Sequence, residues 1–126
     1  MADSFFSDAE FACPCRGCGG RPHPRLIEKL SRVRASLGSS IRVTSGVRCQ
    51  AYQDELARKG HPTAKFSSHV PGNYHPLFGI AADITCAPEF FDRLLELART
   101  EFMCLGIGQG WIHVDLREDK ARCWTY

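Results

Sequence analysis

The sequence has no apolar stretch long enough to span a membrane, and its start, Met1 to Phe6, lacks the basic and long apolar regions of a secretory signal. It also lacks a strong charge of either sign, because its formal net charge is only +2. A basic stripe, the usual mark of a nucleic-acid-binding domain, is missing as well. We therefore expect a protein made in the cytoplasm that binds neither nucleic acid nor membrane, and that reaches an extracellular target only if another agent releases it.

The length and composition are those of a single globular domain. A chain of 126 residues can build one hydrophobic core, and 44% hydrophobic and 24% charged residues are ordinary values for such a domain. We expect residues 1–126 to form one domain and the protein to be a monomer.

Cysteine, in contrast, is abundant. Seven cysteines cannot all pair within one chain, and without a secretory signal reduced thiols or metal ligation are expected before a disulfide framework. Cys13, Cys15, Cys18 and Cys49 could form a structural zinc site of four thiolates, although reduced thiols or a disulfide formed after release from the cell are alternatives. The other three are expected to be buried as small apolar groups: Cys86, Cys104 and Cys123.

The pattern of apolar residues predicts helices early in the chain and strands late. Ser7 and Glu10 form a capping box for a short helical turn, and helices are expected over 24–37, 50–59 and from Pro88 to Phe102. Short strands are expected at 41–44, 79–84, 105–107, 111–116 and 123–126, with loops over 13–24 and 61–78. This order favours an α+β fold, a small antiparallel sheet with helices packed on it, over a doubly wound one.

Strand alternation separates two faces in the segment Trp111 to Leu116. His113 and Asp115 share one face with Trp111, while Ile112 and Val114 point to the other, which we expect to be core. A buried polar face needs partners, and a metal ion would supply them. The same alternation places Asp83 opposite Ile84 in the strand expected before the third helix.

His69, Asp83 and His113 together make the ligand set of a catalytic zinc with an open fourth position. Taken singly, each has a plainer interpretation. A histidine is more often a surface or satisfied core residue, and an aspartate near the end of a strand often belongs to a turn.

Short motifs in a fixed order strengthen the metal hypothesis. They are Glu10-Phe11-Ala12-Cys13-Pro14-Cys15, Ser45-Gly46-Val47-Arg48-Cys49, Ser67-Ser68-His69 with Gly72, Gly79-Ile80-Ala81-Ala82-Asp83-Ile84, and Ile112-His113-Val114-Asp115. This series resembles the zinc D-Ala-D-Ala metallopeptidases, a family of peptidoglycan carboxypeptidases and endopeptidases that includes phage endolysins and shares the fold of the Hedgehog signalling domain.

The resemblance implies a Hedgehog-like fold and a peptidoglycan peptide as substrate. It also implies zinc (Zn2+) bound by His69, Asp83 and His113, with Arg48 binding a substrate carbonyl or carboxylate and stabilising the oxyanion.

Two departures from the family pattern bear on the site. Residues 73–79 interrupt a motif that usually runs without a break, so that His75 competes with His69 as ligand. We favour His69, because Ser67 and Gly72 stand at the motif spacing around it. Gly110 occupies the position where many members carry the general base, which leaves Asp115 either as the base or as a group that orients His113. A non-catalytic zinc-binding module of the same fold, for instance a phage structural component, is the alternative function.

Overall fold

Local capping signals account for where the helices begin and end. The computed structural model describes residues 6–61 and 67–126. Pro24 opens α1 (Pro24–Leu37), the His23 side chain accepts a hydrogen bond from the Arg25 backbone N–H at 3.0 Å, and Gly38 ends the helix in the left-handed conformation with φ of 70°. The other helices are α2 (Gln50–Arg58) and α3 (Phe91–Glu101), with 3-10 helices η1 (Asp8–Phe11) and η2 (Pro88–Phe90). The capping box at Ser7 and Glu10 is present as predicted.

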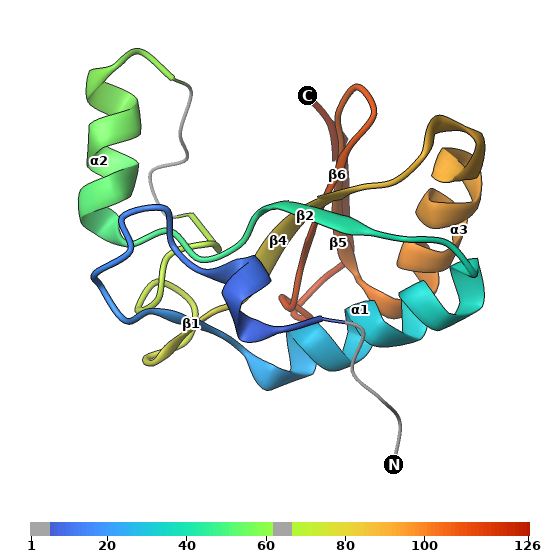
Figure 1. Ribbon diagram of the computed structural model, residues 1–126, viewed down its shortest axis with the longest axis horizontal. Coiled ribbons are helices and arrows are strands. Elements are labelled where there is room, and N and C mark those ends of the chain that lie inside the picture. Colours follow the sequence, from blue (N-terminus) through green and yellow to red (C-terminus); the bar gives the residue numbers. More distant parts are fainter. Residues whose placement is uncertain (1–5, 62–66) are drawn as a thin grey trace.

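Within the described residues, the strands are arranged in a small two-stranded sheet and a five-stranded main sheet, part of which is labelled in Figure 1. β1 (Arg21–Pro22) and β3 (Phe78–Gly79) pair in a small parallel sheet, so the loops expected over 13–24 and 61–78 each contain a short strand. Residues 62–66 of the second expected loop lie outside the described residues. The main sheet has the order β2-β4-β6-β5-β7, and its strands are β2 (Arg42–Ser45), β4 (Ala81–Thr85), β5 (Cys104–Ile107), β6 (Ile112–Asp115) and β7 (Arg122–Thr125).

The main sheet is antiparallel except at one edge. β2, β4, β6 and β5 pair antiparallel in turn, which confirms the expected α+β class, whereas β7 runs parallel to β5. The reason is the connection over 116–121, which returns the chain from the end of β6 to the far side of β5. Both β5 and β7 therefore run opposite to β6.

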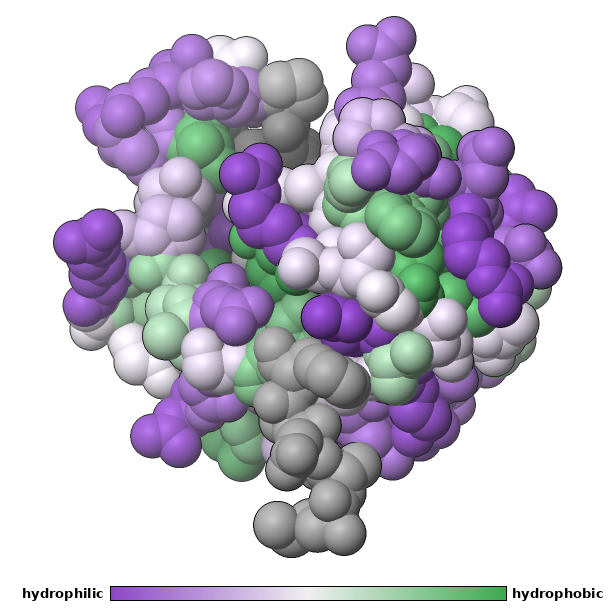
Figure 2. Space-filling view, turned by 45° about the vertical axis from the view of Figure 1, so that its right-hand side comes forward, coloured by the Kyte–Doolittle hydropathy of each residue, from purple (hydrophilic) through white to green (hydrophobic). Residues whose placement is uncertain are grey.

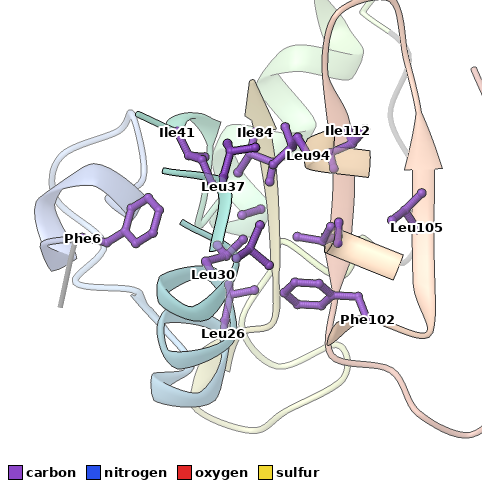
Figure 3. Packing of buried hydrophobic residues seen from close by; sticks show 14 of the residues in the cluster. Phe6, Leu26, Leu30, Leu37, Ile41, Ile84, Leu94, Phe102, Leu105 and Ile112 are labelled. Carbon is purple, nitrogen blue, oxygen red and sulfur yellow. The ribbon is translucent and has the colours of Figure 1, made fainter. Parts of the chain in front are cut away.

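The hydrophobic core lies between the main sheet and the helices α1 and α3. Figure 3 shows Leu26 and Leu30 of α1 and Phe102 after α3 around the same interior as Ile84 and Ile112 of the sheet. Further members of this cluster are Phe6, Phe11, Val33, Leu37, Ile41, Ala82, Leu94, Ala98, Leu105 and Val114. The predicted core face of β6 is thus confirmed, and the opposite face of the sheet is left for polar side chains.

The surface is mainly hydrophilic on the face seen in Figure 2, where hydrophobic residues show in separate areas. Among the described residues, the exposed large hydrophobic side chains are Tyr74, Leu77, Met103 and Tyr126. No helix within 6–61 or 67–126 is both long and apolar enough to cross a membrane.

The cysteines outside the N-terminal loop differ in burial. Cys104 is buried and Cys86 half-buried, but Cys123 is exposed, so the expectation of burial was wrong for Cys123. Cys123 lies on the edge strand β7, beside a hollow at the end of α3 that no other element fills among the described residues.

Candidate metal centre

Three buried side chains direct a nitrogen or oxygen atom toward one point on the polar face of the sheet. His69 Nε2 lies 3.2 Å from His113 Nδ1 and 3.3 Å from Asp83 Oδ1, and His113 Nδ1 lies 2.9 Å from Asp83 Oδ1. Ligand atoms about 2.0 Å from a tetrahedral zinc are about 3.3 Å apart. The three atoms therefore form a nearly ready-made triangle of ligands, and the donor set fits zinc.

Strand register brings two of these side chains together. Asp83 on β4 is paired with His113 on β6, and the same row continues to Ser45 on β2 and, through Gly106 on β5, to Trp124 on β7. Because side chains alternate along a strand, this row faces away from the core and from α1 and α3.

The third side chain, His69, comes from a loop held by backbone hydrogen bonds. The Arg48 N–H donates to His69 O at 3.0 Å, and the Ile80 N–H donates to Ser68 O at 3.0 Å. Gly79 passes so close that a Cβ atom there would lie 2.8 Å from His69 O. The motif glycine at position 79 is therefore required by the close approach of two backbone segments.

A second hydrogen bond on each ring orients the two histidines. His69 Nδ1 lies 2.7 Å from Gly46 O, and since a carbonyl only accepts, Nδ1 carries the proton and Nε2 presents its lone pair. His113 Nε2 lies 2.9 Å from Asp115 Oδ2, which leaves Nδ1 free to face Asp83. Such outer partners fix the ring orientation of metal-binding histidines.

Gly46 is itself held against the N-terminal segment. The Val47 N–H donates to Phe11 O at 2.7 Å, and a Cβ on Gly46 would lie 2.6 Å from Phe11 Cα. The turn η1 thus supports the carbonyl that orients His69. Sequence reasoning missed this role, although Gly46 lies inside the Ser-Gly-Val-Arg motif.

Asp115 is buried and fully bonded. Its side chain receives 2.9 Å and 3.0 Å hydrogen bonds from Arg117 Nη2 and Nε, a further bond from the Arg117 backbone N–H at 3.0 Å, and the contact with His113. Burial alone would raise the pKa of Asp115, but the hydrogen bonds from His113 and Arg117 outweigh it and hold that pKa well below its usual range. Arg117 was also missed from the sequence, because no motif of the resemblance contains it.

Asp83 is held as an anion in a similar way. Burial would raise its pKa, but the contacts with the His113 and His69 rings lower it well below its usual range. Arg48 lies on its other side, with Nη2 3.7 Å from Asp83 Oδ2 and Nε donating to Ser45 Oγ at 3.0 Å. Arg48 is therefore next to the triangle, and its contact with Asp83 is long.

An open hollow adjoins the triangle. It is lined by Arg42, Thr44, Ser45, Arg48, Asp83, Thr85, Gly110 and Trp111. Among the described residues that line it, the only carboxylate is Asp83, which is already directed at the two histidines. Gly110 also lines the hollow and adds no side chain to it.

His75 lies apart from the triangle. Its Nδ1 accepts hydrogen bonds from the backbone N–H groups of Leu77 at 3.1 Å and Phe78 at 3.3 Å, and its ring packs 5.0 Å from that of His23. The structure thus brings His69, and not His75, together with Asp83 and His113. The seven inserted residues instead supply β3, which pairs with β1.

An aromatic wall closes the other side of His113. The Trp124 ring lies 5.5 Å from the His113 ring, and it reaches there across Gly106, where a Cβ would come within 2.6 Å of the indole. The absence of a side chain at Gly106 is what admits the indole.

Comparison with known proteins gives one finding. Residues 4–115 match the family model described as Peptidase M15, which covers well over half of the chain. No curated protein and no solved structure matches.

Replacing each of the two competing histidines tests the geometry. We expect His69→Ala to lower the zinc content of the purified protein by one ion per chain relative to wild type, because it removes one corner of the triangle. His75→Ala is the matched control and should keep the wild-type content. Elemental analysis of both folded variants decides, and zinc loss in His75→Ala alone would contradict the assignment.

Proposed function

The chain belongs to the peptidase M15 family, a family of metallopeptidases, and we propose that it is a zinc-dependent peptidase that hydrolyses stem or cross-bridge peptides of peptidoglycan. The observation that carries the proposal is the buried triangle of His69 Nε2, Asp83 Oδ1 and His113 Nδ1, with both rings oriented from behind. We further propose that the protein acts as a monomer on the cell wall after release from the cell.

His69, Asp83 and His113 would hold the zinc ion, and the hollow beside them would admit the peptide. When bound, zinc would polarise the scissile carbonyl and lower the pKa of a water molecule. The chain's own contribution is to hold Asp83 as an anion, to orient the three ligand atoms and to shield them largely from solvent.

Arg48 would bind the substrate. Ser45 fixes its Nε, while the long 3.7 Å contact with Asp83 leaves the end of the guanidinium available to a ligand. Arg42 lines the same hollow. Two guanidinium groups favour a substrate with a carboxylate near the scissile bond, which a peptidoglycan stem peptide presents at its C-terminus. Arg48 would also stabilise the negative charge that develops on the carbonyl oxygen.

Asp115 would orient His113 and not act as general base. An anion that is bonded to Arg117 and to His113, with 1% of its surface exposed, has little tendency to take a proton from water. Apart from Asp83, the described residues that line the hollow include no carboxylate. A general base typically raises the reaction rate by a factor of about 100 to 10,000. We therefore expect slow turnover.

The second candidate is a non-catalytic zinc-binding module of the same fold, such as a phage structural component. The observation that favours it is Gly110, which leaves the hollow without a base. Both candidates share the zinc site and differ only in hydrolysis.

The decisive experiment incubates zinc-loaded protein with purified peptidoglycan and identifies released peptides by mass spectrometry. We expect new peptide ends that disappear with a chelator and return with added zinc, and their masses identify the bond. A zinc-loaded, folded protein that releases nothing establishes the non-catalytic candidate. Wild-type zinc content in Asp83→Ala would overturn both candidates.

The role of Arg48 in binding the substrate can be tested by comparison with Arg42, which lines the same hollow. We expect Arg48→Ala to lower kcat/KM by roughly 100- to 1,000-fold while zinc content stays at the wild-type level, because a lost oxyanion donor costs about that much. Arg42→Ala, in the same hollow but without a contact to Asp83 among the described residues, should have a much smaller effect. Equal losses in the two variants would contradict a specific role for Arg48.

The role of Asp115 is separable by zinc titration. We expect Asp115→Asn to weaken zinc affinity by roughly 10- to 100-fold, because the His113 ring loses its carboxylate partner. At saturating zinc, peptide release should then return to near the wild-type rate. A folded, fully zinc-loaded Asp115→Asn protein that remains inactive would show that Asp115 is the base instead.

A further inference from the structure

A second cluster of metal-ligand type lies outside the site already described. The sulfur atoms of Cys13, Cys15, Cys18 and Cys49 lie within 4.8 Å of one another, and Cys15 Sγ is 3.8 Å from Cys49 Sγ. Thiolates about 2.3 Å from a tetrahedral zinc are about 3.8 Å apart. We propose that these four cysteines bind a structural zinc ion, independently of any peptidase activity.

Each of the four sulfur atoms also accepts a backbone hydrogen bond. The donors are the N–H groups of Gly17 to Cys15 at 3.5 Å, Gly20 to Cys18 at 3.4 Å, Cys49 to Cys13 at 3.3 Å, and Tyr52 to Cys49 at 3.4 Å. Donors directed at every sulfur favour the thiolate, the form that binds metal. Such an arrangement is not needed for neutral thiols in an ordinary loop.

Hydrogen bonding acts in the same direction at Cys15. The Gly17 N–H, with help from Cys13 and Cys18, lowers the pKa of the Cys15 thiol to about 6. Cys49 is the N-cap of α2, so its sulfur also lies at the positive end of the helix dipole. Cys13 and Cys18 are exceptions. Burial raises the pKa of Cys13 to about 12, and at Cys18 the Gly20 N–H lowers the pKa, but burial and the neighbouring Cys15 raise it overall. At both sulfurs a bound cation would be needed to displace the proton.

The backbone between Cys15 and Cys18 makes a turn with an unfavourable conformation at Arg16. Arg16 has φ of 61°, a left-handed conformation that residues with a Cβ rarely adopt, and its N–H donates to Cys13 O at 3.0 Å. The turn curls residues 13–18 so that three sulfurs face the start of α2. A metal bound to all of them would offset the cost of this conformation.

The ion would tie the N-terminal loop to the support of the candidate metal centre. Cys49 directly follows Arg48, and Gly46, whose carbonyl orients His69, is already bonded through Val47 to Phe11. Zinc at the cysteines would hold the opposite end of the same short segment. Residues 46–49 would then be attached to the N-terminal region on both sides of Arg48.

Cobalt substitution of the wild-type protein, with Asp83→Ala as a comparison, tests the proposal. Zinc is removed under reducing conditions and replaced with Co2+. We expect an intense thiolate-to-cobalt charge-transfer absorption, which a site of two histidines and one aspartate cannot produce. This absorption should persist in Asp83→Ala, so that loss of the first site does not obscure the second.

Zinc stoichiometry provides the matched measurement. We expect the double variant Cys15→Ser/Cys18→Ser to contain one zinc ion fewer than wild type and to unfold at a lower temperature. Cys123→Ser, which removes an exposed cysteine away from the cluster, should keep both values unchanged.

Two results would overturn the proposal. The first is a pair of findings on the wild-type protein: the cobalt form lacks the charge-transfer absorption, and the four cysteines react freely with a thiol reagent in the presence of zinc. The other is the finding, by mass spectrometry of non-reduced peptides from protein prepared under reducing conditions, that two of the four cysteines are joined in a disulfide.

Discussion

The antiparallel pairing of β4 with β6 is the constraint on which the polar face depends. It sets Asp83 directly opposite His113 and, one residue further along, Ile84 opposite Ile112. A slip of one residue would turn Asp83 toward the helices and Ile84 toward the hollow. Ile84 and Ile112 are fully buried. The burial of each such side chain contributes about 1.5–3 kcal/mol to the stability of the folded state. The apolar face therefore stabilises the register that the polar face requires.

The polar face by itself would be costly, since charges removed from water are expensive unless they are paired. Partners from different parts of the chain contact the buried polar groups and offset this cost. Gly46 O comes from the loop before α2, Arg117 from the segment after β6, and Trp124 from the edge strand. Loops and edge thus converge on a row of side chains that the sheet already aligns.

Periodicity was sufficient to predict the α-helices, the strands of the main sheet and the strand-borne part of this row, but not β1 and β3. Alternation within 111–116 separates His113 and Asp115 from Ile112 and Val114 without any knowledge of the partner strands. The support around the row could not be predicted, because it is made by backbone atoms and by contacts distant in sequence. The residue type of Gly46, for example, does not indicate that its carbonyl faces His69.

The inserted residues 73–79 and the edge strand β7 also depend on contacts that the local sequence does not predict. Local spacing around His69 was enough to favour it over His75, but the use of the inserted residues as β3 depends on β1, which is far away in the chain. The parallel placement of β7 depends on which side of β5 the last connection passes. Both are decided by packing between segments distant in sequence, where strand propensity is a weak guide.

Two buried carboxylates of the same residue type have different environments, and this difference separates their roles. Asp115 is held by Arg117 in a close two-point contact of 2.9 Å and 3.0 Å, so its lone pairs are already used. Asp83 meets Arg48 only at 3.7 Å and directs Oδ1 toward two imidazole nitrogens. A divalent cation between these three atoms would be attracted by the charge of Asp83 without breaking a strong ion pair. To bind Asp115, the cation would have to displace the Arg117 guanidinium. The strength of the two arginine contacts, and not the carboxylates themselves, therefore favours Asp83 as ligand and Asp115 as a partner of His113.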